Sequence, residues 1–132
     1  MKPLSSYLTK TLTLGSVIPC ADNSGARSIG IIGVVGYKGR RSRYPTAGVA
    51  DMVIASVKSG KPEMKGKIVK AVIVRAKKEW RRSDGMHVAF EDNAAVLVND
   101  EGLPVGTEIK GVVAREVADR YPKVAAISTG LV

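Results

Sequence analysis

The amino-acid sequence predicts a small, mainly β protein, which we expect to form a closed or half-closed β-barrel. Short segments rich in β-branched residues recur along the chain, and concentrated turn residues separate them. The 132 residues include 14 glycines and 6 prolines, a composition that favours many turns over long helices. Short strands at close spacing are typical of small barrels. The length suits one domain, so we treat residues 1–132 as a single unit.

The expected elements follow from local pattern. Residues 1–10 form a weakly structured arm, and residues 11–21 form one or two short strands before a turn at residues 22–25. Glycines inside the next strand predict strong coiling. The expected later strands or short apolar segments are 28–35, 51–58, 68–75, 86–90, 94–98 and 108–113. Helical spacing occurs only at 114–121 and 124–128, where Pro122 separates short C-terminal helices within residues 114–132.

Charge is segregated along the chain. The formal net charge is +9, from 21 basic and 12 acidic residues. Residues 37–82 hold 14 basic and 3 acidic residues, whereas residues 83–132 hold 4 and 8. This distribution predicts a docking face for a polyanion, usually a nucleic acid and less often an anionic membrane. We expect the acidic half to avoid RNA and to face protein neighbours or solvent.

Three basic loops carry most of the candidate RNA-binding residues. They are residues 37–48, residues 59–67 and the segment that follows the strand at 68–75. Arginine forks match phosphate geometry, and aromatic rings can stack on unpaired bases. The alternatives are a solvated charged face, or membrane binding through an amphipathic helix, which no basic segment contains. The candidates are Asn23, Arg27, Lys38, Arg40, Arg41, Arg43, Lys58, Lys61, Lys65, Lys67, Arg75, Lys77, Lys78, Trp80, Arg81 and Arg82.

The sequence gives little support for nucleotide binding, metal binding or catalysis. Residues 60–68 only superficially resemble a nucleotide loop, because the second glycine comes one residue late and Ile68 replaces the hydroxyl that would hold Mg²⁺. One histidine and one cysteine cannot build a zinc site, so we expect no metal and no cofactor. We interpret Cys20 as a small buried residue and His87 as a half-exposed strand residue, and we expect no enzymatic activity. The lack of disulfides fits a cytosolic setting, and no apolar run approaches the ~20 residues of a membrane span.

Two segments resemble the signature of a known family. Residues 20–27 read CADNSGAR, and residues 71–98 begin with AVIV and contain Asp84, Gly85, Phe90 and Asn93 at characteristic spacings. Both are similar to the universal large-subunit ribosomal protein fourteen family, and the resemblance runs from about residue 12 to the C-terminus. The N-terminal extension and the sequence RRSRYP at 40–45 resemble the archaeal or eukaryotic branch.

The resemblance implies a five-stranded β-barrel with a projecting basic ribbon and small C-terminal helices. It implies a structural protein of the large ribosomal subunit in the cytoplasm, which binds large-subunit (23S-type) rRNA and contributes to intersubunit bridges with small-subunit rRNA. The implied protein neighbours are large-subunit protein three and protein twenty-four-e, and anti-association factors dock on members of the family. The basic loops would then replace counterions around rRNA phosphates.

Two other functions stay open at this point. One is an RNA-binding regulator or chaperone that acts outside the ribosome with the same barrel. The other is a small-barrel enzyme acting on RNA, whose turnover would depend on His87 or a carboxylate.

Overall fold

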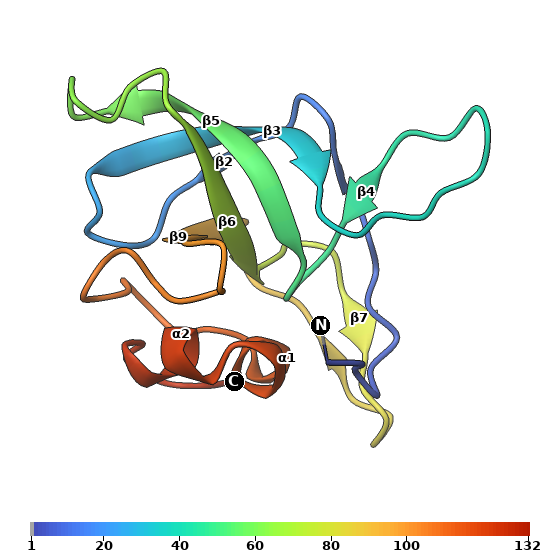
Figure 1. Cartoon of the computed structure of the whole chain (residues 1–132). Helices are drawn as coiled ribbons and strands as arrows, with labels where there is room; N and C mark the ends of the chain where they lie inside the picture. Colours follow the sequence, from blue (N-terminus) through green and yellow to red (C-terminus); the bar gives the residue numbers. More distant parts are fainter. Residues whose placement is uncertain (1) are drawn as a thin grey trace.

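The computed structural model describes residues 2–132 and confirms the mainly β class, with short helices near the C-terminus (Figure 1). Met1, the first residue of the predicted arm, lies outside the described residues. The strands are β1 (Leu12–Thr13), β2 (Val17–Pro19), β3 (Ala26–Val34), β4 (Thr46–Ala47), β5 (Met52–Gly60), β6 (Ile68–Arg75), β7 (Trp80–Arg81), β8 (His87–Val88) and β9 (Ala94–Val98). The helices are α1 (Arg115–Arg120) and α2 (Pro122–Ala126).

The main sheet has five antiparallel strands in the order β2-β3-β5-β6-β9. The register between β3 and β5 shifts three times, which agrees with the coiling predicted from the glycines of β3. The two edge strands approach each other where Cys20 makes a parallel bridge to Ala95 and the Ala21 amide donates to the Ala95 carbonyl at 2.9 Å. Strands β2 and β9 do not pair along their length, so strand pairing within residues 2–132 does not confirm the predicted closed barrel.

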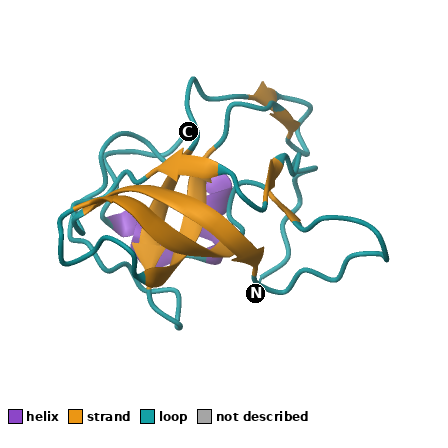
Figure 2. Ribbon diagram, turned by 90° about the horizontal axis from the view of Figure 1, so that it is seen from above, coloured by secondary structure: helices purple, strands orange, loops and turns teal. Residues whose placement is uncertain are grey.

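The central strands are buried on both faces. Alternate residues of β6 point to opposite sides, so Ala71 and Ile73 join one apolar cluster and Val72 and Val74 join another. The first cluster lies inside the curled sheet, with branched side chains from β2, β3, β5 and β9. The second is covered by α1, α2 and the segment around Trp80. Figure 2 shows the helices behind the sheet. This double burial explains why β6 and β9 read as continuous apolar runs.

The C-terminal region confirms the helices but not the last strand. Helix α1 ends at Arg120, and Pro122 is the first residue of α2, a position where its missing N–H costs nothing. The predicted strand at 108–113 is wrong, because only single bridges from Ile109 to Asp22 and from Val113 to Leu131 occur there. Gly111 adopts a positive φ of 83°, and the intervening carbonyls accept from an arginine rather than from a neighbouring strand.

The basic loops leave the sheet at different places. The loop between β3 and β4 projects far from the molecule in both views, and β4 at its base pairs with β1 (Figures 1 and 2). The loop between β5 and β6 leaves the opposite end of the sheet in Figure 1. The third basic segment forms the β7–β8 hairpin. The predicted arm is irregular but docked, since Tyr7 bridges to Arg81 and both Leu4 and Leu8 pack on the core.

Candidate nucleic-acid interface

Most candidate RNA-binding side chains lie at the surface. Thirteen of the sixteen are exposed, and they come from the turn before β3 and the start of that strand, the end of β5, the two long loops and the β7–β8 region. They are Asn23, Arg27, Lys38, Arg40, Arg41, Arg43, Lys58, Lys61, Lys65, Lys67, Lys77, Lys78 and Arg81. Within residues 2–132, Lys78 is the only member of this set in an ion pair, with the neighbouring Glu79 at 3.0 Å. These cations therefore keep most of their charge available to solvent or to a ligand.

Trp80 is not positioned to stack on a base. Its side chain is 2% exposed, and the centroid of its ring lies 5.9 Å from the centroid of the Phe90 ring. The indole N–H donates to Glu116 at 3.2 Å, which satisfies its polar atom inside the protein. The structure therefore uses Trp80 as a core residue that anchors β7.

Arg82 is also engaged internally. Its guanidinium donates to both carboxylate oxygens of Glu116, at 2.8 and 3.2 Å, and to the Val132 carbonyl at 2.6 Å. Ser6 donates to the same carboxylate at 3.0 Å. Glu116 thus joins four segments: the arm, the β7–β8 hairpin, α1 and, through Arg82, the C-terminus.

Opposing effects act on the carboxylate of Glu116. Burial alone would raise its pKa, but the hydrogen bonds from Arg82, the backbone, Trp80 and Ser6 outweigh burial and hold the pKa below its usual range. The carboxylate is therefore charged at neutral pH and pairs with Arg82.

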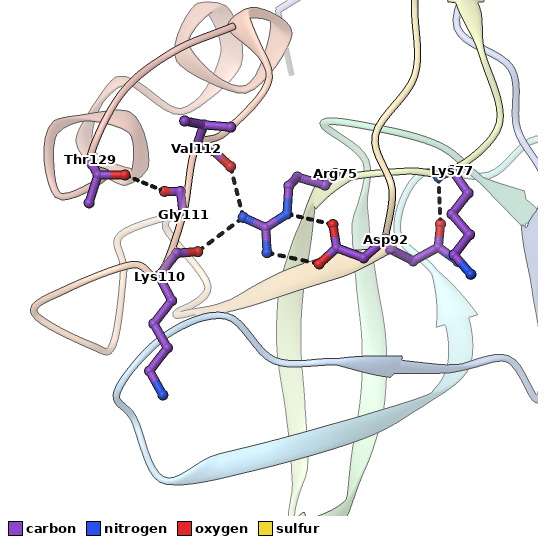
Figure 3. A network of polar contacts seen from close by, with 8 residues as sticks. Arg75, Lys77, Asp92, Lys110, Gly111, Val112 and Thr129 are labelled. Carbon is purple, nitrogen blue, oxygen red and sulfur yellow. Dashed lines mark hydrogen bonds and ion pairs between the residues drawn. The ribbon is translucent and has the colours of Figure 1, made fainter.

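Arg75, at the end of β6, lies in a second internal network, which Figure 3 shows from close by. Its Nε and Nη2 atoms donate to the two carboxylate oxygens of Asp92 at 3.0 and 3.2 Å. Its Nη1 atom donates to the carbonyls of Lys110 at 3.0 Å and Val112 at 2.9 Å. This guanidinium ties the sheet to the segment that precedes α1.

The turn before β3 and the loop after β5 form a surface cleft of about 650 Å³. The two walls are joined because the Lys61 amide donates to the Gly25 carbonyl at 3.0 Å. Three predicted cations, Arg27, Lys61 and Lys65, line the cleft together with Lys110. Asn23 also lines it, but its side chain is committed to the backbone and hydroxyl of Thr107. The structure thus brings one group of predicted residues together, whereas the β3–β4 loop lies apart from them.

Asp22 is the one acidic residue that lines this cleft among the described residues, and it is buried. Its carboxylate accepts hydrogen bonds from the thiol of Cys20, from the amide and hydroxyl of Ser24, and from the Leu97 amide. These donors satisfy the buried carboxylate inside the protein, and all the exposed charged side chains that line the cleft are cationic.

The structure gives no sign of catalytic side chains at Cys20 or His87. Cys20 is half-buried rather than buried as predicted. Burial of its thiol, followed by a hydrogen bond to Asp22 and the charge of that residue, raises the pKa of the thiol to about 12. A thiol in this state is a poor nucleophile at neutral pH. His87 lies on the exposed side of β8, so it is more exposed than predicted. The side chains of residues 2–132 contain no group of three or more potential metal ligands, and no helix there is long and apolar enough to cross a membrane.

Sequence reasoning missed two residues that organise the site. Glu116 is one of several acids in the C-terminal half, and nothing in its local pattern marks it as buried. Lys110 is an isolated lysine in the same half, and only the tertiary structure places it beside Arg27 and Lys61.

The chain is similar to known proteins along almost its whole length. Residues 11–132 match the family described as ribosomal protein L14p/L23e. The chain is 54% identical over 132 residues to the large ribosomal subunit protein uL14 of Thermoplasma volcanium, with 100% of both chains covered. It is 51% identical over 129 residues to the protein of that name from Methanocorpusculum labreanum, with 98% of each chain covered. The protein of that name from Nanoarchaeum equitans is 53% identical over 129 residues, with 97% of each chain covered.

These relatives are archaeal, which confirms the branch indicated by the N-terminal extension and the RRSRYP loop. The match extends over almost the whole chain and includes both signature segments, at residues 20–27 and 71–98. The chain therefore belongs to the ribosomal protein L14p/L23e family, in its archaeal form.

Proposed function

We propose that this protein, a structural and non-enzymatic constituent of the large ribosomal subunit in the cytoplasm, binds large-subunit rRNA through its exposed basic loops. The observation that carries the proposal is the exposure of thirteen predicted polar and cationic side chains, most of them without an ion-pair partner in residues 2–132. Binding of such loops to phosphates releases counterions, which supplies affinity that falls with salt.

The curled sheet supports this role as a rigid base for the loops. We propose that the sheet acts as a five-stranded barrel, closed at the Cys20–Ala95 bridge rather than by a complete strand ladder. A base of this kind would hold the loops at set positions, so that the protein recognises RNA shape rather than base sequence. Arg75, Trp80 and Arg82 contribute to this base from inside the protein.

The projecting β3–β4 loop supports a contact that reaches beyond the protein's own rRNA site. We propose that this loop takes part in an intersubunit bridge to small-subunit rRNA, because it extends furthest from the sheet and carries Lys38, Arg40, Arg41 and Arg43. The acidic C-terminal half would face protein neighbours, for which large-subunit protein three, protein twenty-four-e and anti-association factors are the candidates.

The first test measures binding of the purified full chain to deproteinised large-subunit rRNA over a range of salt concentrations. A variant in which Lys61, Lys65 and Lys67 are replaced by glutamine removes three exposed cations from the β5–β6 loop. If this loop contacts rRNA phosphates, the negative slope of log affinity against log salt becomes shallower by up to about 3. The melting temperature is unchanged because the loop is exposed. A slope change near zero would exclude this loop from the rRNA contact in the free protein.

The matched control replaces Arg115 and Lys123, exposed cations of the C-terminal helices, with glutamine. We expect this control to bind rRNA almost as tightly as the natural protein. An equal loss in the control would contradict the proposal that the acidic half avoids RNA.

A second experiment separates the ribosomal role from an RNA-binding regulator or chaperone. Cell extract is sedimented through a gradient at moderate salt, and the protein is detected across the fractions. Co-migration with large subunits and assembled ribosomes is the expected result. A signal only at the top of the gradient would overturn the assignment to the subunit.

A further inference from the structure

Four cations line the cleft between the turn before β3 and the loop after β5, and only two of them, Lys61 and Lys65, belong to a basic loop. Arg27 is the second residue of β3, Lys61 and Lys65 belong to the loop after β5, and Lys110 comes from the irregular segment before α1. All four side chains are exposed, and none forms an ion pair within residues 2–132. Like charges are thus gathered around one hollow without a counter-charge at its rim, which favours an anionic ligand.

The position of Lys110 is held by backbone contacts on both sides of the residue. Its amide donates to the Ala21 carbonyl at 2.6 Å, and the next contact toward the turn is the bridge between Ile109 and Asp22. Its carbonyl accepts from Arg75 at 3.0 Å. Figure 3 shows the Lys110 side chain extending away from the Arg75 guanidinium, toward the ribbon that leads into β3. Arg75 therefore fixes the backbone from which Lys110 reaches the cleft.

We infer that this cleft binds an unstacked nucleotide of the rRNA, with its phosphate among the four cations, and that Arg75 is a positioning residue for Lys110. The inference rests on the proposed rRNA binding and specifies its chemistry at one site. A hollow of about 650 Å³ is within the range of sites that enclose small molecules, so a single nucleotide fits. A base within a regular RNA helix is stacked and paired, whereas a looped or bulged nucleotide can turn its base and phosphate into a hollow.

The walls of the cleft suit this ligand. Its lining includes two glycines, Gly25 and Gly60, and Ser59, whose hydroxyl is hydrogen-bonded to that of Ser28 at 2.7 Å. The carboxylate of Asp22 is buried and accepts its hydrogen bonds inside the protein, so the exposed charges at the rim are all positive. The cations at the rim come from three separate segments, which favours a compact anion over an extended duplex backbone.

The test uses the full chain and three RNA probes: deproteinised large-subunit rRNA, a short oligouridylate and a perfect RNA duplex. Lys110→Ala should weaken binding to the large-subunit rRNA roughly tenfold and lower the salt slope by about 0.7 to 0.9, the effect of one phosphate contact. The matched control is Lys123→Ala, which removes an exposed lysine from α2, outside the cleft, and should change affinity less than about twofold. In the natural protein, oligouridylate should perturb the amide resonances of Gly25, Lys61 and Lys110 more than the duplex does.

The positioning role of Arg75 is tested separately, by the salt dependence of rRNA binding in an Arg75 variant. Arg75→Lys keeps the charge but loses the fork that holds Asp92 and the two carbonyls. If Arg75 acts through Lys110, this variant should lower the salt slope like Lys110→Ala, and the double variant should bind no more weakly than the weaker single variant. A role confined to stability would instead lower the melting temperature and leave the salt slope unchanged, which would overturn the positioning role.

Failure of this inference is distinguishable from failure of the proposed function. If Lys110→Ala binds like Lys123→Ala while Arg27→Ala and Lys61→Ala lose affinity, rRNA binding stands and Lys110 does not belong to the site. Equal perturbation of the cleft amides by duplex and oligouridylate would overturn the unstacked nucleotide. If the natural protein binds large-subunit rRNA no better than it binds an unrelated RNA, the proposed function itself fails.

Discussion

At the scale of single residues, each buried carboxylate receives hydrogen bonds from segments distant in sequence. Glu116 accepts from Ser6, Trp80 and Arg82, while Asp51 accepts from Arg120, 69 residues further along the chain. Within residues 2–132, no buried side-chain nitrogen or oxygen lacks a partner. Burying a polar group that has a hydrogen-bond partner costs little free energy. If one partner is removed, the other stays buried without a hydrogen bond, and the protein loses the full desolvation free energy of that group.

Cys20 provides a test at this scale. Burial and the neighbouring Asp22 raise its thiol pKa to about 12, so the thiolate is scarce at neutral pH. At about pH 8 we expect iodoacetamide to alkylate the native protein at least roughly thirtyfold more slowly than the urea-unfolded protein, after allowing for the greater reactivity of a more basic thiolate. The rate can be followed by mass spectrometry. Native and unfolded rates within about a factor of three would contradict the burial and charge assigned to this thiol.

At the scale of elements, the β7–β8 hairpin is held by polar contacts as well as by packing. Two of its basic-segment residues, Trp80 and Arg82, turn inward to Glu116 on α1, whereas Lys77, Lys78 and Arg81 stay exposed. A hairpin this short is not stable alone in water. Contacts with α1 and the arm are therefore what set the direction of its exposed cations.

Removal of the Glu116 carboxylate tests this arrangement. We expect Glu116→Ala to lower the free energy of unfolding by about 3 kcal/mol at neutral pH, because Arg82 loses its partner in a nearly buried position. Glu116→Gln keeps the shape and an acceptor but not the charge, so it should cost less. Urea unfolding followed by the Trp80 fluorescence provides the measurement.

The same residue predicts a pH dependence. The folded-state pKa of Glu116 lies below the ordinary value of 4.5, so its stabilisation is complete above pH 4.5 and is lost as the pH falls through the folded-state pKa. The stability difference between the natural protein and Glu116→Gln should therefore shrink below pH 4.5. A difference that stays constant in acid would show that the charge of Glu116 does not contribute.

At the scale of the whole molecule, the curled sheet depends on a junction between its first and last strands. The Cys20–Ala95 bridge is short, and the Asp22 carboxylate adds a hydrogen bond from the Leu97 amide at 3.1 Å. The Lys110 amide extends the junction by donating to Ala21. These contacts bring the turn of the CADNSGAR segment, β9 and the C-terminal region to one place, next to the cationic cleft.

Asp22→Ala should therefore weaken the whole fold. It leaves the buried Leu97 amide without an acceptor, and we expect the free energy of unfolding to fall by about 2–3 kcal/mol. Asp100→Ala is the control, since that carboxylate is 87% exposed in its pair with Lys70 and its removal should change stability by less than about 0.5 kcal/mol. Hydrogen exchange of the Leu97 amide should accelerate only in Asp22→Ala. Similar stability losses in both variants would argue against a junction at Asp22.

Local patterns in the sequence predicted most of the β elements, because alternation of branched apolar residues and the placement of turn residues act over a few positions. The strands at 51–58 and 68–75 correspond to β5 and β6, and Pro122 marks the division between the helices. The strand expected at 108–113 failed because Gly111 adopts a positive φ and Arg75 occupies the carbonyls on either side of it. The spacing of apolar residues along the chain contains no information about either cause.

The sequence by itself determined the fold class, the family and the segregation of charge, since each depends on residue types and spacings along the chain. Only the tertiary structure decided which cations face outward. Arg75 and Arg82 lie in basic stretches, but Asp92 and Glu116, 17 and 34 residues further along the chain, turn them inward, while Lys110 joins the cleft from the acidic half. The physical reason is that a buried or half-buried arginine needs acceptors within hydrogen-bonding distance, and packing of distant segments determines which acceptors are there.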